Sequence, residues 1–371
     1  MSFLVSVITP VYNAAPYVRH AVESALALNE VGELILIEDG SSDGSYDICR
    51  SLAREHSRVR LFTHSGRRNK GAGASRNVGI RNASFPCVAF LDADDFYLPN
   101  RFETAERILT EQAGIDGVYD AVGVHFWSEE GRSRWNRATG KDEEPPPLTV
   151  LRVRCAPDEL FQLMAPVGGC GHFHTAGVTV RSSVFHRTGL FSTNLPMAQD
   201  TNLWMKMAAV ARLMPGNLSE PAAMRGVHAG NRIHDAQAVS RYGMEAVYNF
   251  VVWALRRNVP LNTVRLALSC WWRWTSRHCE QYGDNGWRRP ENILRLLRLL
   301  LYGRGIAQQP EFKQALSALT GYGLLKTRAA RWLDRAGSQD SGRSVTETPP
   351  LSTAPGAPNG SLRGKKADGA S

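Results

Sequence analysis

Three carboxylates stand together in the segment Asp92-Ala93-Asp94-Asp95, directly after the apolar residues 87–91. Such a run predicts a buried strand, and ligands of open parallel sheets bind beyond the carboxyl ends of the strands. Acidic side chains this close repel one another unless a cation shares the site. Mg²⁺ or Mn²⁺ fits, because it binds carboxylate oxygens and keeps positions open for phosphate. A solvated acidic turn that caps the next helix is the alternative, and the four residues alone favour neither.

Two further segments place polar residues at the same edge of the predicted sheet. Asp39 ends the apolar run 34–37, where its carboxylate could accept hydrogen bonds from a base or from sugar hydroxyls, or could cap the following helix. Arg76 and Asn77 follow Gly71-x-Gly73 and offer a cation and an amide to the same ligand. This glycine pattern matches neither a dinucleotide-binding fingerprint nor a Walker loop.

The elements that position these residues alternate between strand and helix patterns. Strands are predicted at residues 4–11, 34–37, 59–62 and 87–91, and helices at 16–28 and 72–81. This alternation predicts right-handed crossovers. We therefore expect an α/β fold, with a Rossmann-like mixed and mainly parallel sheet flanked by helices.

The second half of the chain is less regular. We expect a strand at residues 118–127, a polar surface insertion at 128–147, a short helix at 157–164, a strand at 176–180 and a helix at 201–213. After residue 234 the pattern is helical and basic. Residues 337–371 have the Ser, Thr, Pro and Gly content of a disordered tail.

The formal charge of +9 is unevenly distributed along the chain. From Arg241 onward there are 20 Lys and Arg against 9 Asp and Glu, whereas residues 1–240 hold 24 against 26. A basic region can contact an anionic membrane surface, an acidic polymer or nucleic acid, and charge alone does not choose. No stretch has the roughly 18 uninterrupted apolar residues of a membrane span, and the first residues lack a secretory signal pattern. With no CxxC pairing, we expect a cytoplasmic protein with reduced thiols.

Four segments follow one another in the first hundred residues: Val7-Ile8-Thr9-Pro10-Val11-Tyr12-Asn13, Ile37-Glu38-Asp39-Gly40-Ser41-Ser42-Asp43-Gly44, Asn69-x-Gly71 with Ala74-Ser75-Arg76-Asn77-x-Gly79, and Phe90-Leu91-Asp92-Ala93-Asp94-Asp95. In this order and spacing they closely resemble the family 2 glycosyltransferases of GT-A fold. A looser match continues to about residue 232, with Gln199-Asp200-Thr201-Asn202-Leu203-Trp204-Met205-Lys206 and Arg225-x-x-His228-x-x-Asn231.

Several positions depart from the pattern that the resemblance brings with it. Where the family usually has Glu, Asp, Arg and Ser, this chain has Gln199, Asn202, Lys206 and Asn231. The aspartate at the position of the family's base is kept as Asp200, so catalysis stays the preferred interpretation.

The resemblance implies inverting transfer of a sugar from a nucleotide-diphosphate sugar, UDP-linked in most of the family, to an acceptor hydroxyl. It implies a divalent metal, Mn or Mg, and a role in polysaccharide, lipopolysaccharide or other glycoconjugate synthesis. Residue by residue it assigns the base to Asp200, the metal to Asp94 and His228, and the nucleotide sugar to Pro10, Tyr12, Asp39, Arg76 and Asp92.

With this resemblance the chain divides into four parts. Residues 1–115 form the nucleotide-sugar-binding half of a GT-A domain, 116–233 its acceptor-binding half, 234–336 a basic helical region and 337–371 a disordered tail. The expected partners are the sugar donor and a glycan or lipid-linked acceptor, with no nucleic acid. The basic helices could seat the protein on the inner face of the membrane, although helices packed on the catalytic domain explain the leucines of residues 293–301 equally well.

Plainer interpretations stand beside these assignments. Asp200 could be only a helix N-cap and His228 an ordinary turn residue, while His172 and His174 are more often structural than part of an acceptor pocket. A glycan- or membrane-binding relative with weak or no activity is the main alternative function. A sugar nucleotidyltransferase is disfavoured, because such enzymes need a Gly-rich loop where this chain has Pro10-Val11-Tyr12-Asn13.

Overall fold

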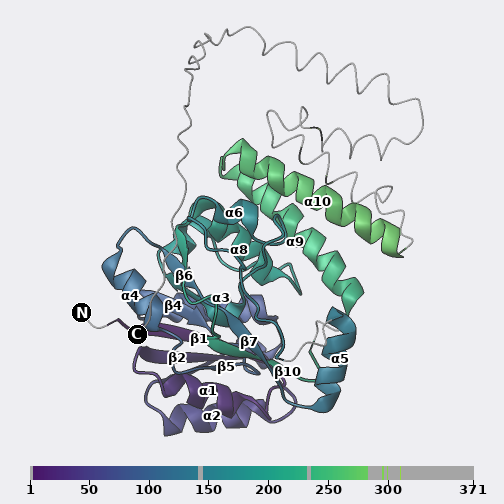
Figure 1. The fold of residues 1–371 in the computed structure, drawn as a ribbon. Helices are drawn as coiled ribbons and strands as arrows, with labels where there is room; N and C mark the ends of the chain where they lie inside the picture. The colour runs from purple at the N-terminus through teal and green to yellow at the C-terminus, as the bar shows by residue number, and fades with distance from the viewer. Residues whose placement is uncertain are drawn as a thin grey trace, which may run out of the picture. The chain divides into compact units, whose positions relative to one another are not determined.

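A central sheet of seven strands runs through the part of the chain that the structure describes (Figure 1). The structure is a computed structural model that describes residues 3–140, 145–231 and 235–282 with the single residues 295, 299 and 310, all within the unit Met1–Gly321. The strand order is β3-β2-β1-β4-β8-β6-β9. The bounds are β1 Val5–Val11, β2 Val31–Glu38, β3 Val59–Thr63, β4 Cys87–Phe90, β6 Gly117–Tyr119, β8 Val178–Arg181 and β9 Leu213–Pro215.

The pairing of these strands confirms the predicted fold class. β1 pairs in parallel with both β2 and β4, and β2 pairs in parallel with β3. Only β8 runs against its neighbours β4 and β6, while β6 and β9 are again parallel. The result is a mixed, mainly parallel sheet.

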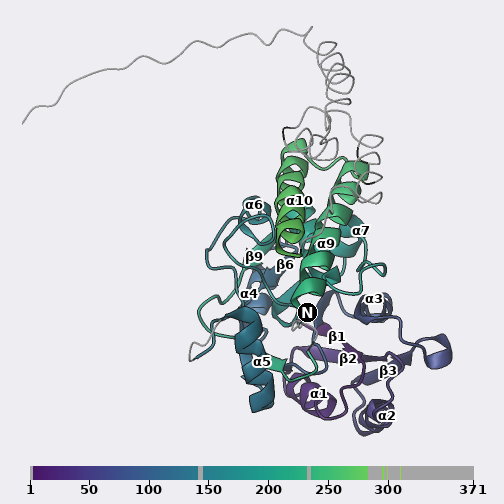
Figure 2. The same cartoon turned by 90° about the vertical axis from the view of Figure 1, so that its right-hand side faces the viewer.

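Helices cover both faces of the sheet, as Figures 1 and 2 show, with α1 and α2 below it and α3 and α8 above it in Figure 1. Because helices cover both faces, the central strands are buried and need apolar residues on both of their sides. Leu34 and Leu36 of β2 pack into the core on one face, and Ile35 and Ile37 pack into the core on the other. This alternation is the two-residue period of a strand. The bounds are α1 Val18–Leu26, α2 Ser45–Glu55, α3 Ala72–Asn82, α4 Glu103–Glu111, α6 Leu160–Leu163, α7 Val184–Thr188 and α8 Gln199–Val210.

The single strand that we predicted at residues 118–127 is two strands in two sheets. β6 ends at Tyr119, and β7 (Val122–Phe126) joins a small sheet of order β5-β10-β7, with β5 at Phe96–Tyr97 and β10 at Ala223–Val227. Asp120 separates them, because its backbone N–H donates to Gly177 and its buried carboxylate accepts from the N–H of Asn217. An apolar run cannot show where pairing changes from one sheet to another.

The expected surface insertion at 128–147 contains a helix. α5 spans Glu129–Thr139, and Ser128 caps it by accepting from the N–H of Gly131. Its Trp135 is buried against Val124 and Val227 of the small sheet. The polar composition hid this helix because one buried tryptophan is its main apolar contact.

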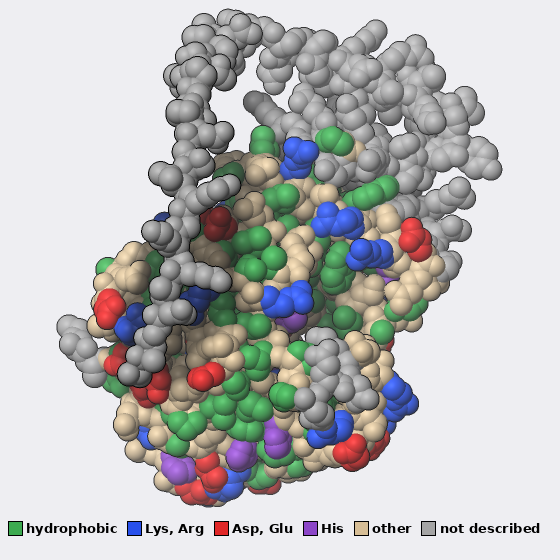
Figure 3. All heavy atoms as spheres, in the orientation of Figure 1, with side chains coloured by type: hydrophobic (Ala, Val, Ile, Leu, Met, Phe, Trp, Pro, Cys, Tyr) green, Lys and Arg blue, Asp and Glu red, His purple; other side chains and the backbone are tan. Residues whose placement is uncertain are grey.

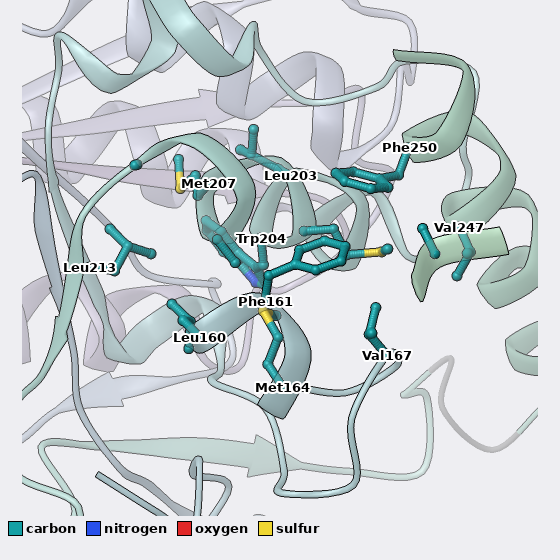
Figure 4. Close-up of a cluster of buried hydrophobic side chains, with 14 of the residues drawn as sticks. Leu160, Phe161, Met164, Val167, Leu203, Trp204, Met207, Leu213, Val247 and Phe250 are labelled. Atoms are coloured by element: carbon teal, nitrogen blue, oxygen red, sulfur yellow. The ribbon is translucent and has the colours of Figure 1, made fainter. Parts of the chain in front are cut away.

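Two long helices follow the α/β part, as the basic helical pattern predicts. α9 spans Ala236–Arg256 and α10 spans Leu261–Tyr282, and the two pack against each other. Figure 4 shows side chains of α6, α8 and α9 meeting in one cluster, among them Phe161, Trp204 and Phe250. Trp271 of α10 is buried beside Tyr248, which makes it a packing residue. Apart from residues 295, 299 and 310, the remainder of the basic region lies outside the described residues, as does the predicted tail.

Candidate active site

Asp94, His228 and Asn231 meet at the carboxyl edge of the sheet. Oδ2 of Asp94 lies 3.2 Å from Nε2 of His228 and accepts a hydrogen bond of 3.0 Å from Nδ2 of Asn231. Asn231 also accepts from the backbone N–H of His228, so it fixes both partners. Tyr17 stacks on the His228 ring at 4.8 Å between centroids. The structure therefore brings together the two residues that the resemblance assigns to the metal.

Whether these residues fit a divalent ion depends on their ligand atoms. The described residues contain no cluster of three or more Asp, Glu, His and Cys side chains that could hold a metal. An ion of the Mg²⁺ type can nevertheless be held by one or two protein ligands and completed by substrate phosphates and water. Asp94 fits this role, since its carboxylate is about a quarter exposed.

His228 fits the ion only after a change of tautomer. Its Nδ1 accepts from the N–H of Gly230, so the proton of the neutral ring is on Nε2, where it donates to Asp94. An imidazole nitrogen binds a metal through its lone pair, and the other nitrogen then carries the proton. His228 can join the ion once its proton moves to Nδ1.

Asp95 has a structural position that its place in the sequence does not reveal. Its carboxylate is buried and accepts from the backbone N–H of Gly226 at 2.9 Å, which ties the acidic segment to β10. Burial, and then the charges of Asp94 and Asp92, raise the pKa of Asp95 well above its usual range. Asp95 precedes the short strand β5, so it does not cap a helix.

Gly226 allows this close approach of β10. A side chain at this position would collide with the carbonyl oxygen of Asp94, only 1.8 Å from an added Cβ. The same carbonyl accepts from the indole N–H of Trp127 at 2.9 Å. Sequence reasoning did not identify Gly226 or Trp127, because nothing in their local sequence shows what crosses them.

The buried Arg76 pairs with the partly exposed carboxylate of Asp92. Nη2 of Arg76 donates to Oδ1 of Asp92 at 2.5 Å, and Arg76 is only 3% exposed. Burial lowers the pKa of Arg76, but the carboxylates of Asp92 and Asp200 raise it overall. Arg76 therefore stands within electrostatic reach of both carboxylates, although they come from segments more than a hundred residues apart. Its Nε and Nη1 are buried without a hydrogen-bond partner in the described residues.

The neighbouring Asn77 does not face a ligand as we expected. Its amide donates to the carbonyl of Phe191 and accepts from the N–H of the same residue, both at 2.9 Å. The amide thus holds the loop at Phe191 on α3, and the Phe191 ring lies 5.3 Å from the Arg76 guanidinium.

Asp39 holds the loop that leads into α3. Its two oxygens accept from the backbone N–H groups of Lys70 and Gly71 at 2.7 and 2.9 Å. At the start of the following helix α2, it is Asp43 that accepts a hydrogen bond from the backbone N–H of Ser45. The alternative of Asp39 as the cap of that helix is therefore wrong. On the neighbouring strand, Pro10 lies near the end of β1 and Tyr12 just beyond it, with the Tyr12 ring half exposed.

Asp200 lies in the first turn of α8 but does not cap it. The cap position is Ala198, in a left-handed conformation with φ of 58°. Oδ1 of Asp200 accepts from the backbone N–H of Thr201, a first-turn N–H of α8, and from the Thr201 hydroxyl. No described hydrogen bond involves its Oδ2, and the charge of the carboxylate acts on Arg76.

Two of the departures from the family pattern face α9. Asn202 is fully buried and donates its amide N–H to the carbonyl of Ala246 at 2.8 Å, which an ionised aspartate could not do. Lys206 is 9% exposed and lies 5.8 Å from the Trp253 ring. Burial lowers the pKa of Lys206 to about 8. These changes belong to the packing of the added helices.

His174 begins the turn that precedes β8. Its Nδ1 accepts from the N–H of Ala176 at 3.3 Å and lies 3.7 Å from Oδ2 of Asp95. Burial and the nearby charge of Arg225 lower the pKa of His174 to about 3, so the ring is neutral. These contacts fit the structural role that the sequence favours for this histidine.

Comparison of the sequence with known proteins finds glycosyltransferases. Residues 6–163 match the model of the family described as glycosyl transferase family 2. An uncharacterized glycosyltransferase of Rickettsia felis is 31% identical over 210 residues, and one of Rickettsia typhi is 28% identical over 238 residues. These alignments cover 56% and 64% of this chain, and 32% and 66% of the two relatives. The chain thus spans about a third of the length of the Rickettsia felis relative.

Solved structures show the same fold at low identity. The S. aureus TarS fragment 1-349 in complex with UDP-GlcNAc superposes with a TM-score of 0.58 at 16% identity, covering 91% of this chain and 92% of the fragment. The same fragment in complex with UDP gives 0.55 at 15% identity, covering 93% and 94%. The fold is thus that of the GT-A enzymes. Residues 6–163 of the chain are thus similar to the family 2 glycosyltransferases.

Proposed function

We propose that the protein transfers a sugar, with inversion, from a nucleotide-diphosphate sugar to an acceptor hydroxyl. The observation that carries this proposal is the buried Arg76, which donates to Asp92 and feels the charge of Asp200, together with the pair of Asp94 and His228 two residues beyond Asp92. Carboxylates and one buried cation at the carboxyl edge of a parallel sheet suit a diphosphate ligand with a metal ion.

A UDP-linked donor is the first choice. The TarS fragment with the same fold has been solved with UDP and with UDP-GlcNAc. In our proposal Pro10, Tyr12, Asp39 and Arg76 hold the nucleotide and Asp92 lies toward the ribose. The half-exposed ring of Tyr12 supports stacking on the base.

The chain's own residues have distinct tasks in the transfer step. Asp200 takes the proton from the acceptor hydroxyl while the oxygen of that hydroxyl attacks the anomeric carbon. The bond from this carbon to the diphosphate breaks, and the nucleoside diphosphate leaves from the opposite side, so the configuration inverts. Asp94, joined by His228, would hold a Mn²⁺ or Mg²⁺ ion. When bound, that ion offsets the charge that develops on the leaving diphosphate.

The other parts of the chain have roles that follow from this proposal. Residues 1–115 would bind the donor and residues 116–233 the glycan or lipid-linked acceptor, in polysaccharide, lipopolysaccharide or glycoconjugate synthesis. No helix in the described part of the chain is both long and apolar enough to cross a bilayer. On the face in Figure 3, Lys and Arg are spread over the part that α9 and α10 form, while Asp and Glu lie mainly around α1, α2 and α4. This basic face supports contact with an anionic membrane surface at the cytoplasmic side.

The test joins binding and turnover in matched variants. Calorimetry with UDP, GDP and dTDP in Mn²⁺ identifies the nucleotide, and release of that nucleotide from its sugar derivatives reports turnover. Asp200→Asn should bind the nucleotide as the wild type does and lose turnover at least a hundredfold. The control is Asp47→Asn, since Asp47 is 81% exposed on α2 and should change neither. Full turnover in Asp200→Asn, or no binding of any of the three nucleotides, would refute the proposal.

A binding protein without turnover is the second candidate. The changed residues next to Asp200 favour it, although Asn202 and Lys206 face α9. It predicts Mn²⁺-dependent nucleotide binding with no release of nucleotide across a broad panel of acceptors.

A further inference from the structure

Gln199 is a buried polar residue next to the proposed base. It is the first residue of α8, is 5% exposed, and its Oε1 is buried with no hydrogen-bond partner in the described residues. Buried amides are nearly always paired, and an unpaired one costs about 1–3 kcal/mol. Its amide N–H₂ has no hydrogen bond within the described residues either. The amide can therefore turn end for end about its last torsion without breaking a bond.

Gln199 packs against the first turn of α3, the helix that also carries Arg76. A Cβ added to Gly73, in the first turn of α3, would lie 3.3 Å from Cγ of Gln199 and 2.9 Å from the carbonyl oxygen of Ser192. Gly73 thus lets α8 and α3 meet closely at their first turns. Arg76, one turn further along α3, has its own unpaired Nε and Nη1. Where α3 meets α8, the donors Nε and Nη1 of Arg76 and the acceptor Oε1 of Gln199 thus have no partner among the described residues. A polar ligand could form hydrogen bonds with all three atoms.

We propose that the Gln199 amide binds a hydroxyl group of the transferred sugar and thereby selects the donor. This inference rests on the proposed function. Asp200 must lie near the anomeric carbon to act as base, so the residue beside it lies near the sugar and not near the nucleotide base. A diphosphate at neutral pH only accepts hydrogen bonds, whereas a hydroxyl both donates and accepts, as an amide does.

The amide of Gln199 also differs in charge from the glutamate that is usual at this position in the family. Asp92, Asp95 and Asp200 already act on the neighbouring Arg76, and another negative charge next to Asp200 would raise the pKa of the base. Gln199 supplies the hydrogen bonds without this charge. Gln199→Glu should therefore move the acidic limb of the pH–rate profile to higher pH.

The decisive experiment separates the sugar from the nucleotide. Calorimetry in Mn²⁺ compares the nucleoside diphosphate that the wild type binds with its glucose, galactose, mannose and N-acetylglucosamine derivatives. In Gln199→Met, the affinity for the diphosphate alone should stay within twofold, while the affinity for the best sugar derivative should fall about tenfold. Gln162→Met is the matched control, because Gln162 is exposed on α6 and should change neither affinity.

Each result decides a different question. Equal losses for the diphosphate and the sugar derivative, or no loss for either, would make Gln199 a packing residue and overturn the inference. The same holds if no sugar derivative binds the wild type differently from its diphosphate. Failure of the wild type to bind any diphosphate refutes the proposed function instead. A thermal unfolding midpoint near that of the wild type shows that Gln199→Met is folded.

Discussion

Asn202→Asp tests whether α8 is tied to α9 by a hydrogen-bond donor. Asn202 is fully buried and donates to the carbonyl oxygen of Ala246 at 2.8 Å. An ionised carboxylate would face that oxygen with a second acceptor, so the new side chain must take up a proton to donate. At pH 7, about three units above the usual aspartate pKa, this proton costs about 4 kcal/mol.

The pH dependence of this loss follows from the pKa of the new carboxyl. It is higher in the folded chain than in the unfolded chain, so the folded state binds more protons and stability is lost as pH rises. The deficit of Asn202→Asp against the wild type should shrink by about 1.4 kcal/mol per unit as pH falls from 7 toward 4. Asn202→Ala removes the hydrogen bond and leaves a small cavity, so it should cost about 1–3 kcal/mol, by the same amount at every pH.

The assay is urea unfolding, followed by circular dichroism, at pH 7, 6 and 5. Asn262→Asp is the control, because Asn262 is exposed in the first turn of α10 and its change should stay within about 0.5 kcal/mol. The reasoning fails if Asn202→Asp is as stable as the wild type at pH 7, or if its deficit does not change with pH.

Three other predictions concern separate contacts. Arg101→Lys should lower the free energy of unfolding by about 2 kcal/mol or more, since the buried guanidinium donates to the carbonyls of Ala176 and Val178 and one ammonium cannot replace this fork. An unchanged urea midpoint would contradict it. The stability of the wild type relative to Lys206→Met should rise from pH 8 to 10 by up to about 1.4 kcal/mol per unit, because burial lowers the folded-state pKa of Lys206 and the unfolded chain then binds more protons. Urea titrations of both proteins at both pH values measure this difference, and a constant difference would contradict it. Asp94→Asn should weaken Mn²⁺-dependent nucleotide binding at least tenfold in calorimetry while leaving the unfolding midpoint in place, and undiminished binding would exclude Asp94 as a ligand.

Sequence reasoning could predict those site residues that directly follow a strand. Asp39, Asp92 and Asp94 follow apolar segments, and β1 pairs in parallel with β2 and β4, so the strands that precede these residues end at one edge of the sheet, as predicted. The partners could not be predicted in this way. Asp95 binds Gly226 and Asn77 binds Phe191 across more than a hundred residues, and no local pattern reports such contacts.

The secondary structure was likewise predictable where it depends on local pattern, and not where it depends on distant contacts. The strands β1 to β4 and the helices α1 and α3 lie where the apolar periodicity predicts them, because burial on both faces leaves a clear pattern. The break at Asp120 and the helix α5 were missed, since each depends on which sheet or surface the segment meets.

The amino-acid sequence by itself indicated the class of chemistry, through carboxylates that follow apolar strands, and the resemblance to family 2 glycosyltransferases, through four motifs in order. Only the tertiary structure decided what each polar group contacts. In the structure the amides of Asn77 and Asn202 bind backbone groups of neighbouring segments. Atoms of Gln199 and Arg76 are buried without a hydrogen-bond partner among the described residues. The physical reason is that the need for hydrogen bonds is a property of a residue type, whereas the partner that meets this need is set by the chains that cross it.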